Sequence, residues 1–103
     1  MTATMNDRIE QVKEVINTLI QISRVENEVC RVLSVKVDEA INANNINQAI
    51  AHLVELDAQQ NNRDKRENQA YAMQEQLSYI ETHVKYEISE EEAAIQLEAL
   101  LKA

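Results

Sequence analysis

The sequence predicts an all-α protein: an antiparallel hairpin of two long helices plus a short C-terminal helix, within a bundle of three or four helices. Two observations carry this prediction. Glycine and proline, the usual residues of tight turns and kinks, are both absent from the 103 residues. Apolar residues recur at steps of three and four over most of the chain, which is typical of one helix face.

The first predicted helix spans about 5–41. Its inward face holds Ile9, Val12, Ile16, Leu19, Cys30, Leu33, Val37 and Ala40. A second apolar row lies beside this face and holds Val15, Ile22, Val25, Val29 and Val32. Because the two rows together are wider than one facing helix normally covers, we expect dimerisation or a partner to complete the bundle.

The second predicted helix spans about 46–86 and follows the segment Asn42-Ala43-Asn44-Asn45, in which asparagine tolerates left-handed backbone. Its expected inward residues are Ala49, Ile50, Leu53, Leu56, Ala70, Met73, Leu77, Ile80 and Val84. No residue in 59–69 is apolar. This segment is therefore either a loop that breaks the helix or three solvated turns of a continuous helix.

A continuous helix would place polar residues at the contact between the two long helices. Extending the spacing of Ala70 and Met73 backwards puts Arg63 and Arg66 on the inward face. Antiparallel folding then brings Arg63 near Glu26 and Arg66 near Ser23. We expect these four residues to form a polar seam, which fixes the register of the helices rather than adding much stability.

The third predicted helix spans about 90–102. Ser89 is expected to cap it, with Glu92 in the position of a capping box. This helix should fold back over the end of the hairpin that holds the N-terminus, and the whole chain, 1–103, should form one helical domain. Its inward residues are expected to be Ala94, Leu97, Leu100 and Leu101.

The sequence contains no catalytic, cofactor-binding or metal-binding motif. His52 and Glu55 lie one helical turn apart, but the Glu-x-x-His order of di-metal helical bundles is absent. Cys30 lies on the apolar face, where a thiol behaves as a small hydrophobic side chain. We therefore expect no enzymatic activity, no cofactor and no small-molecule substrate.

Net charge and hydropathy limit the classes of partner that this chain is expected to bind. The net charge of −8 argues against direct nucleic-acid binding, which needs clustered Lys and Arg. No apolar run reaches the roughly 18 residues of a membrane span, and the N-terminal ten residues contain no apolar run of signal length. The single cysteine excludes an internal disulfide. A cytoplasmic location is expected, with no membrane partner.

The predicted function is binding to another protein, or to a second copy of the chain, as an adaptor, chaperone or inhibitor. The predicted partner or dimer interface consists of Val25, Val29, Val32, Val35, Tyr71, Tyr79 and Tyr86. For the tyrosines, the competing interpretation is that the last helix covers them. An alternative function is acidic mimicry of nucleic acid, which would block a DNA- or RNA-binding protein through Glu81, Glu87, Glu90, Glu91, Glu92 and Glu98.

Overall fold

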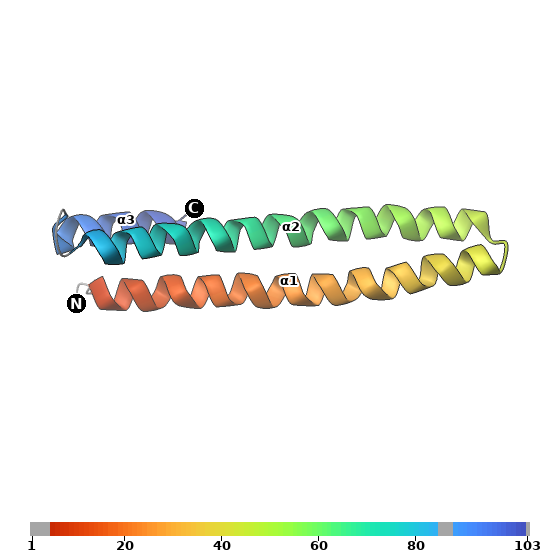
Figure 1. The fold of residues 1–103 in the computed structure, drawn as a ribbon, viewed down its shortest axis with the longest axis horizontal. Coiled ribbons are helices and arrows are strands. Elements are labelled where there is room, and N and C mark those ends of the chain that lie inside the picture. The colour runs from red at the N-terminus through yellow and green to blue at the C-terminus, as the bar shows by residue number, and fades with distance from the viewer. Residues whose placement is uncertain (1–4, 85–87, 103) are drawn as a thin grey trace. The chain divides into compact units, whose positions relative to one another are not determined.

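The computed structural model describes residues 5–84 and 88–102, and these residues form three helices and no strand (Figure 1). Helix α1 spans Met5–Asn42, α2 spans Ile46–His83 and α3 spans Glu90–Lys102. Of the two interpretations of 59–69, the structure has the continuous helix. The predicted last turn of the second helix falls partly on residues 85–87, outside the described residues.

The chain divides into two compact units. The turn unit comprises Ile20–Glu67, and the terminal unit comprises Met1–Leu19 with Asn68–Ala103. Within the turn unit, the second half of α1 and the first half of α2 are antiparallel neighbours joined by residues 43–45 (Figure 1). Within the terminal unit, the remaining parts of α1 and α2 associate with α3.

The turn between α1 and α2 is made by asparagine in place of glycine. Asn44 has φ 59°, in the left-handed region. The amide of Asn45 donates to the carbonyl of Ala40 at 2.8 Å, and that of Asn44 donates to the carbonyl of Ile41 at 3.0 Å. These are the two bonds of a Schellman motif, which satisfies the last carbonyls of α1.

Asn45 also starts α2. Its Oδ1 accepts from the backbone amide of Gln48 at 3.2 Å, while its Nδ2 donates to Gln48 Oε1 at 3.0 Å. An asparagine oxygen that accepts from the third helical amide is a favourable N-cap. One residue therefore ends the motif that closes α1 and begins α2, so the connection needs only three residues.

The terminal unit has an apolar core supplied by all three helices. Its three most deeply buried large side chains, Val12, Ile80 and Leu97, come from α1, α2 and α3 respectively. The other buried core residues are Ile16, Ala70, Met73, Leu77 and Ala93. As predicted, α3 belongs to the compact unit that contains the N-terminal part of α1.

The start of α3 confirms the predicted cap, because Ser89 Oγ accepts from the amide of Glu92 at 3.2 Å. A salt bridge of 3.6 Å between Arg8 and Glu98 links α1 to α3. Of the predicted inward residues of α3, Leu97 is fully buried, while Ala94, Leu100 and Leu101 are half-buried and Ala93 takes the second buried position.

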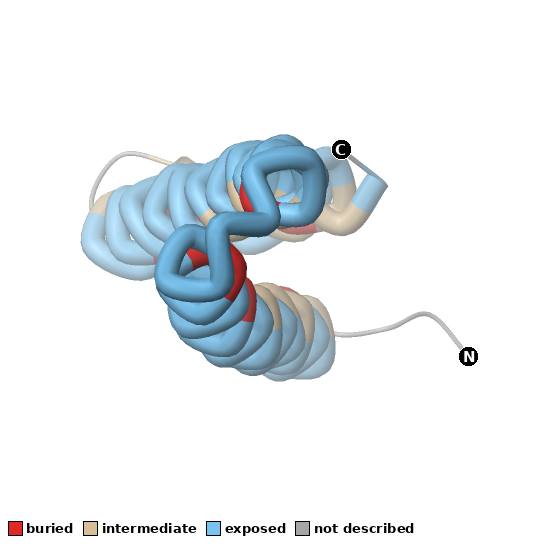
Figure 2. Tube along the Cα trace, turned by 90° about the vertical axis from the view of Figure 1, so that its right-hand side faces the viewer, coloured by how far each residue is buried: buried red, intermediate tan, exposed pale blue. Residues whose placement is uncertain are grey.

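The turn unit has a thinner core. Its buried side chains on α1 are Ser23, Cys30, Leu33, Val37 and Ala40, whereas α2 contributes only Ala49. Figure 2 shows the buried residues confined to the line where the two helices meet, with most of both helices near the turn exposed. A two-helix unit has no third element to cover its outer faces, so large aliphatic side chains remain in solvent.

Two expected inward residues of α2 point outward instead. Ile50 is 53% exposed and Leu53 is 47% exposed. The inward row of α2 runs backwards from Ala70 in strict steps of four and three. In the turn unit its positions are Ala49, His52, Leu56, Gln59, Arg63 and Arg66, of which only Ala49 is buried and the others are half-buried.

Candidate protein-binding surface

The most distinctive surface feature of the turn unit is an aliphatic strip on α1, which consists of Ile22, Val25, Val29, Val32 and Val35. These residues follow one another at steps of three or four, and each is between 38% and 65% exposed. The predicted interface valines all belong to the strip. The neighbouring row at Cys30, Leu33 and Val37 already contacts α2, so the strip has no covering element within the turn unit.

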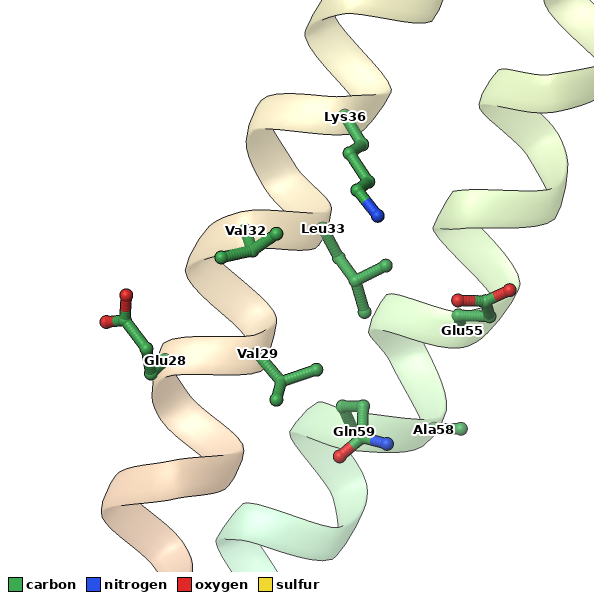
Figure 3. Close-up of a pocket in the computed structure, with 8 residues that line it drawn as sticks. All are labelled: Glu28, Val29, Val32, Leu33, Lys36, Glu55, Ala58 and Gln59. Atoms are coloured by element: carbon green, nitrogen blue, oxygen red, sulfur yellow. The ribbon is translucent and has the colours of Figure 1, made fainter.

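A groove lies between the strip and α2 (Figure 3). Its volume is about 540 Å³. Val29, Leu33 and Lys36 point from α1 toward α2, whereas Glu28 points away from α2 (Figure 3). The lining residues are Glu28, Val29, Val32, Leu33, Lys36, Glu55, Ala58 and Gln59. The α1 side of the groove is apolar at Val29, Val32 and Leu33, and charged residues from both helices also line it.

Glu28 is engaged by its own helix. Arg31 donates to the Glu28 carboxylate from Nε at 3.1 Å and from Nη2 at 2.6 Å. This hydrogen-bonded ion pair lowers the pKa of Glu28 and raises the pKa of Arg31. Both side chains are exposed, so the pair contributes little to folding.

Two of the three tyrosines of the predicted interface, Tyr71 and Tyr79, lie in the described part of the chain, and both are exposed. Tyr71 is 66% exposed and Tyr79 is 51% exposed, so α3 does not cover them as the competing interpretation expected. Tyr79 stacks on His83 of its own helix, with 3.9 Å between the ring centroids. Tyr86 lies outside the described residues. A partner contact through Tyr71 and Tyr79 stays a prediction.

The four residues of the predicted polar seam lie in the turn unit, but their pairing differs from the expected one. Ser23 is buried, and its hydroxyl donates to the carbonyl of Ile20 at 2.7 Å. Glu26 forms an ion pair with Arg66 rather than with Arg63, with 3.6 Å between Oε1 and Nε. Arg63 instead donates to Asn27 Oδ1 at 2.9 Å. The register of the helices thus differs from the expected one by less than one turn.

Arg63 is also tied to its own helix. Its guanidinium donates to the Asp64 carboxylate, and this hydrogen bond is the main cause of the raised pKa of Arg63. The seam therefore contains two arginines with different partners. Arg63 has hydrogen bonds to Asn27 and Asp64, whereas Arg66 faces Glu26 without one.

Three buried polar atoms of the turn unit have no hydrogen-bond partner among the described residues: Glu26 Oε1, Arg66 Nε and His52 Nδ1. All three side chains occupy inward positions of their helices. A buried polar atom without a hydrogen bond lowers the stability of the folded state. The contact between α1 and α2 in the turn unit is therefore a weak part of the fold.

No three His, Cys, Asp or Glu side chains gather closely enough to hold a metal ion anywhere in 5–84 or 88–102. His52 stands on the inward face of α2, and Cys30 is a buried free thiol on α1. No helix in the described part of the chain combines the length and apolarity that crossing a membrane requires.

A second exposed apolar group, which sequence reasoning missed, lies near the turn and consists of Ile41, Ile46, Ile50 and Leu53, each between 47% and 57% exposed. The sequence feature that could have indicated this group is the strict spacing of the inward row of α2, which leaves Ile50 and Leu53 on the outer side of that helix. The turn unit thus exposes far more aliphatic surface than the terminal unit, whose exposed large apolar residues are Tyr71, Tyr79 and Ile95 among those described.

The described residues thus form an all-α protein. Its terminal unit includes a third helix, and its turn unit has exposed aliphatic surfaces. Comparison with known protein families, with characterised proteins and with solved structures finds no match.

Proposed function

We propose that this chain is a non-enzymatic binding protein that uses the aliphatic strip to hold an apolar helix of another protein. The exposed row of Ile22, Val25, Val29, Val32 and Val35 supports this most directly. Single exposed aliphatic residues are ordinary on protein surfaces, but a continuous row of five on one helix is typical of an interaction surface.

The spacing of the strip favours a helical partner. Steps of three and four repeat along α1 as they do at a coiled-coil contact, where side chains of one helix insert between those of the other. Four of the five strip residues are valines, whose branched side chains have few rotamers. They lose little side-chain entropy when a partner covers them.

The chemistry of the groove beside the strip agrees with this assignment. Val29, Val32 and Leu33 line its α1 side, and its volume of about 540 Å³ leaves room for a bulky apolar side chain of the partner. Lys36 and Glu55 line the groove as well. Polar or charged residues beside the apolar row of the partner could therefore pair with a positive or a negative side chain. The main attraction is apolar and should depend weakly on salt.

Acidic mimicry is the second candidate function. Glu90, Glu91 and Glu92 follow one another in the first turn of α3, and all three are exposed. Binding through these carboxylates would be electrostatic, so it should weaken steeply as salt increases.

One capture experiment separates the two candidates. The full chain is immobilised and exposed to extract of its native cell, and bound proteins are measured at low salt and at about 1 M salt, where the screening length is about 3 Å. We expect binding to survive the salt and to be lost in the double variant Val29→Asp and Val32→Asp. Loss in salt, or in the triple variant Glu90→Lys, Glu91→Lys and Glu92→Lys, would instead support mimicry.

The matched control is the double variant Ser34→Asp and Gln60→Asp, which adds the same charge at exposed positions of the same unit away from the strip. It should bind as the unaltered chain does. Light scattering tests whether the bound helix is a second copy: a mass of twice 11.8 kDa that falls to the monomer value in Val32→Asp would identify self-association.

A further inference from the structure

The turn unit and the terminal unit differ in how α2 is held. In the terminal unit the inward residues of α2 are Ala70, Met73, Leu77 and Ile80, and all are buried. In the turn unit four of the six residues of the corresponding row are polar or charged, and only Ala49 at its start is buried. The same helix therefore has a strong apolar contact in one unit and a weak one in the other.

The polar side chains between α1 and α2 in the turn unit lack some of their hydrogen bonds. Glu26 is 13% exposed, and its Oε1 lies 3.6 Å from Arg66 Nε, a distance that allows an ion pair but no hydrogen bond. His52 Nδ1 is a third buried atom without a partner. In water each of these atoms would regain hydrogen bonds, so separation of the helices restores solvation that folding removed.

From this asymmetry we infer that residues 46–67 of α2 separate from α1 in a local opening and lose helical hydrogen bonds, because an unpacked helix is marginal in water, while the terminal unit stays folded. The opening hydrates Glu26, Arg66 and His52, and it exposes Cys30, Leu33 and Val37 beside the aliphatic strip. It is a conformational property of the turn unit and does not depend on the proposed binding function. Local openings of this kind lie well below the free energy of global unfolding.

Amide hydrogen exchange of the full chain tests the inference. We expect 46–67 to exchange at least about tenfold faster than 70–83 under native conditions. Replacing the ion pair by Glu26→Leu with Arg66→Leu should slow exchange of 46–67 by roughly tenfold, because apolar replacement of such a pair is often stabilising. Exchange of 70–83 should not change. Equal protection of both segments in the unaltered chain would overturn the inference.

The control is Asp38→Leu with Lys65→Leu, which removes one acidic and one basic side chain from exposed positions of the same unit. Exchange in both segments should stay as in the unaltered chain. Slowing by this control equal to that of the seam variant would show that apolar substitution in general, rather than the seam, controls the opening, and would contradict the inference.

Cys30 provides a second readout that needs no variant. It is the single cysteine and is 5% exposed, so a thiol reagent reaches it only when the turn unit opens. Local opening exposes little surface and should make the labelling rate depend weakly on urea, whereas global unfolding gives a steep dependence. A labelling rate that follows the urea dependence of global unfolding from zero urea upward would overturn the inference.

Discussion

Glu26 and Arg66 face each other between the two helices of the turn unit, with 3.6 Å between Oε1 and Nε and no hydrogen bond at either atom. The attraction between the two charges nonetheless offsets part of the cost of burying each of them. Removing one partner leaves the other partly buried and alone, which costs more than the pair itself contributes.

The single variants of this pair should therefore be worse than the double variant. Because Arg66 is 40% exposed, we expect Glu26→Ala to lower the free energy of unfolding by only about 1 kcal/mol. Glu26→Ala with Arg66→Ala should cost less than the sum of the two single changes. Urea unfolding of all four proteins gives the coupling, and strictly additive costs would show that the two residues do not interact.

The turn should respond specifically at Asn44, whose φ is 59°. Alanine at this position carries a Cβ that clashes in left-handed backbone, so Asn44→Ala should destabilise by about 1 kcal/mol. Asn44→Gly should be neutral or slightly stabilising, since glycine carries no such penalty.

Thermal unfolding measures both changes. Asn42→Ala is the control, because Asn42 is the last residue of α1 and has ordinary helical backbone. If Asn44→Ala were as stable as Asn44→Gly, the left-handed turn would be contradicted.

Helix α3 offers a matched pair of apolar residues. Leu97 is fully buried, whereas Ile95 is 68% exposed. Leu97→Ala should cost about 2–5 kcal/mol through lost burial and the cavity left behind, and Ile95→Ala should change stability by less than about 0.5 kcal/mol. Equal effects in urea unfolding would mean that α3 does not dock as described.

Glu28 should titrate with a pKa below its ordinary value of 4.5, because Arg31 binds its charged form. The stabilisation from this pair is thus present above pH 4.5 and is lost as the pH falls through the lowered pKa. NMR titration of the Glu28 carboxyl carbon measures this shift. In Arg31→Gln the midpoint should return toward the ordinary value, and an unchanged midpoint would exclude Arg31 as the cause.

Much of the fold could be predicted because local signals agree with the tertiary contacts. The inward row of α1 from Val12 to Ala40 is regular and apolar except at Ser23 and Glu26, and Ser89 is a recognisable cap. The number of helices and their approximate ends follow from such patterns, as does the two-helix contact.

The α2 part of the turn unit could not be predicted equally well. There the strict spacing places His52 and Gln59 inward and Ile50 and Leu53 outward, so hydrophobicity and register disagree. Within the turn unit the inward positions of α2 follow steps of three and four residues rather than the local hydrophobicity. The pairing of Glu26 with Arg66 depends on the offset between helices, which the sequence does not encode locally.

The central claim, that the aliphatic strip is a binding surface, is tested most directly by site-specific photo-crosslinking in the native cell. A photoreactive amino acid replaces Val29 in one variant and Ser34, an exposed residue of the same helix away from the strip, in another. We predict a discrete crosslinked product, of a partner or of a second copy, from position 29 and none from position 34. Products of equal yield from both positions, or none from position 29, would contradict the claim.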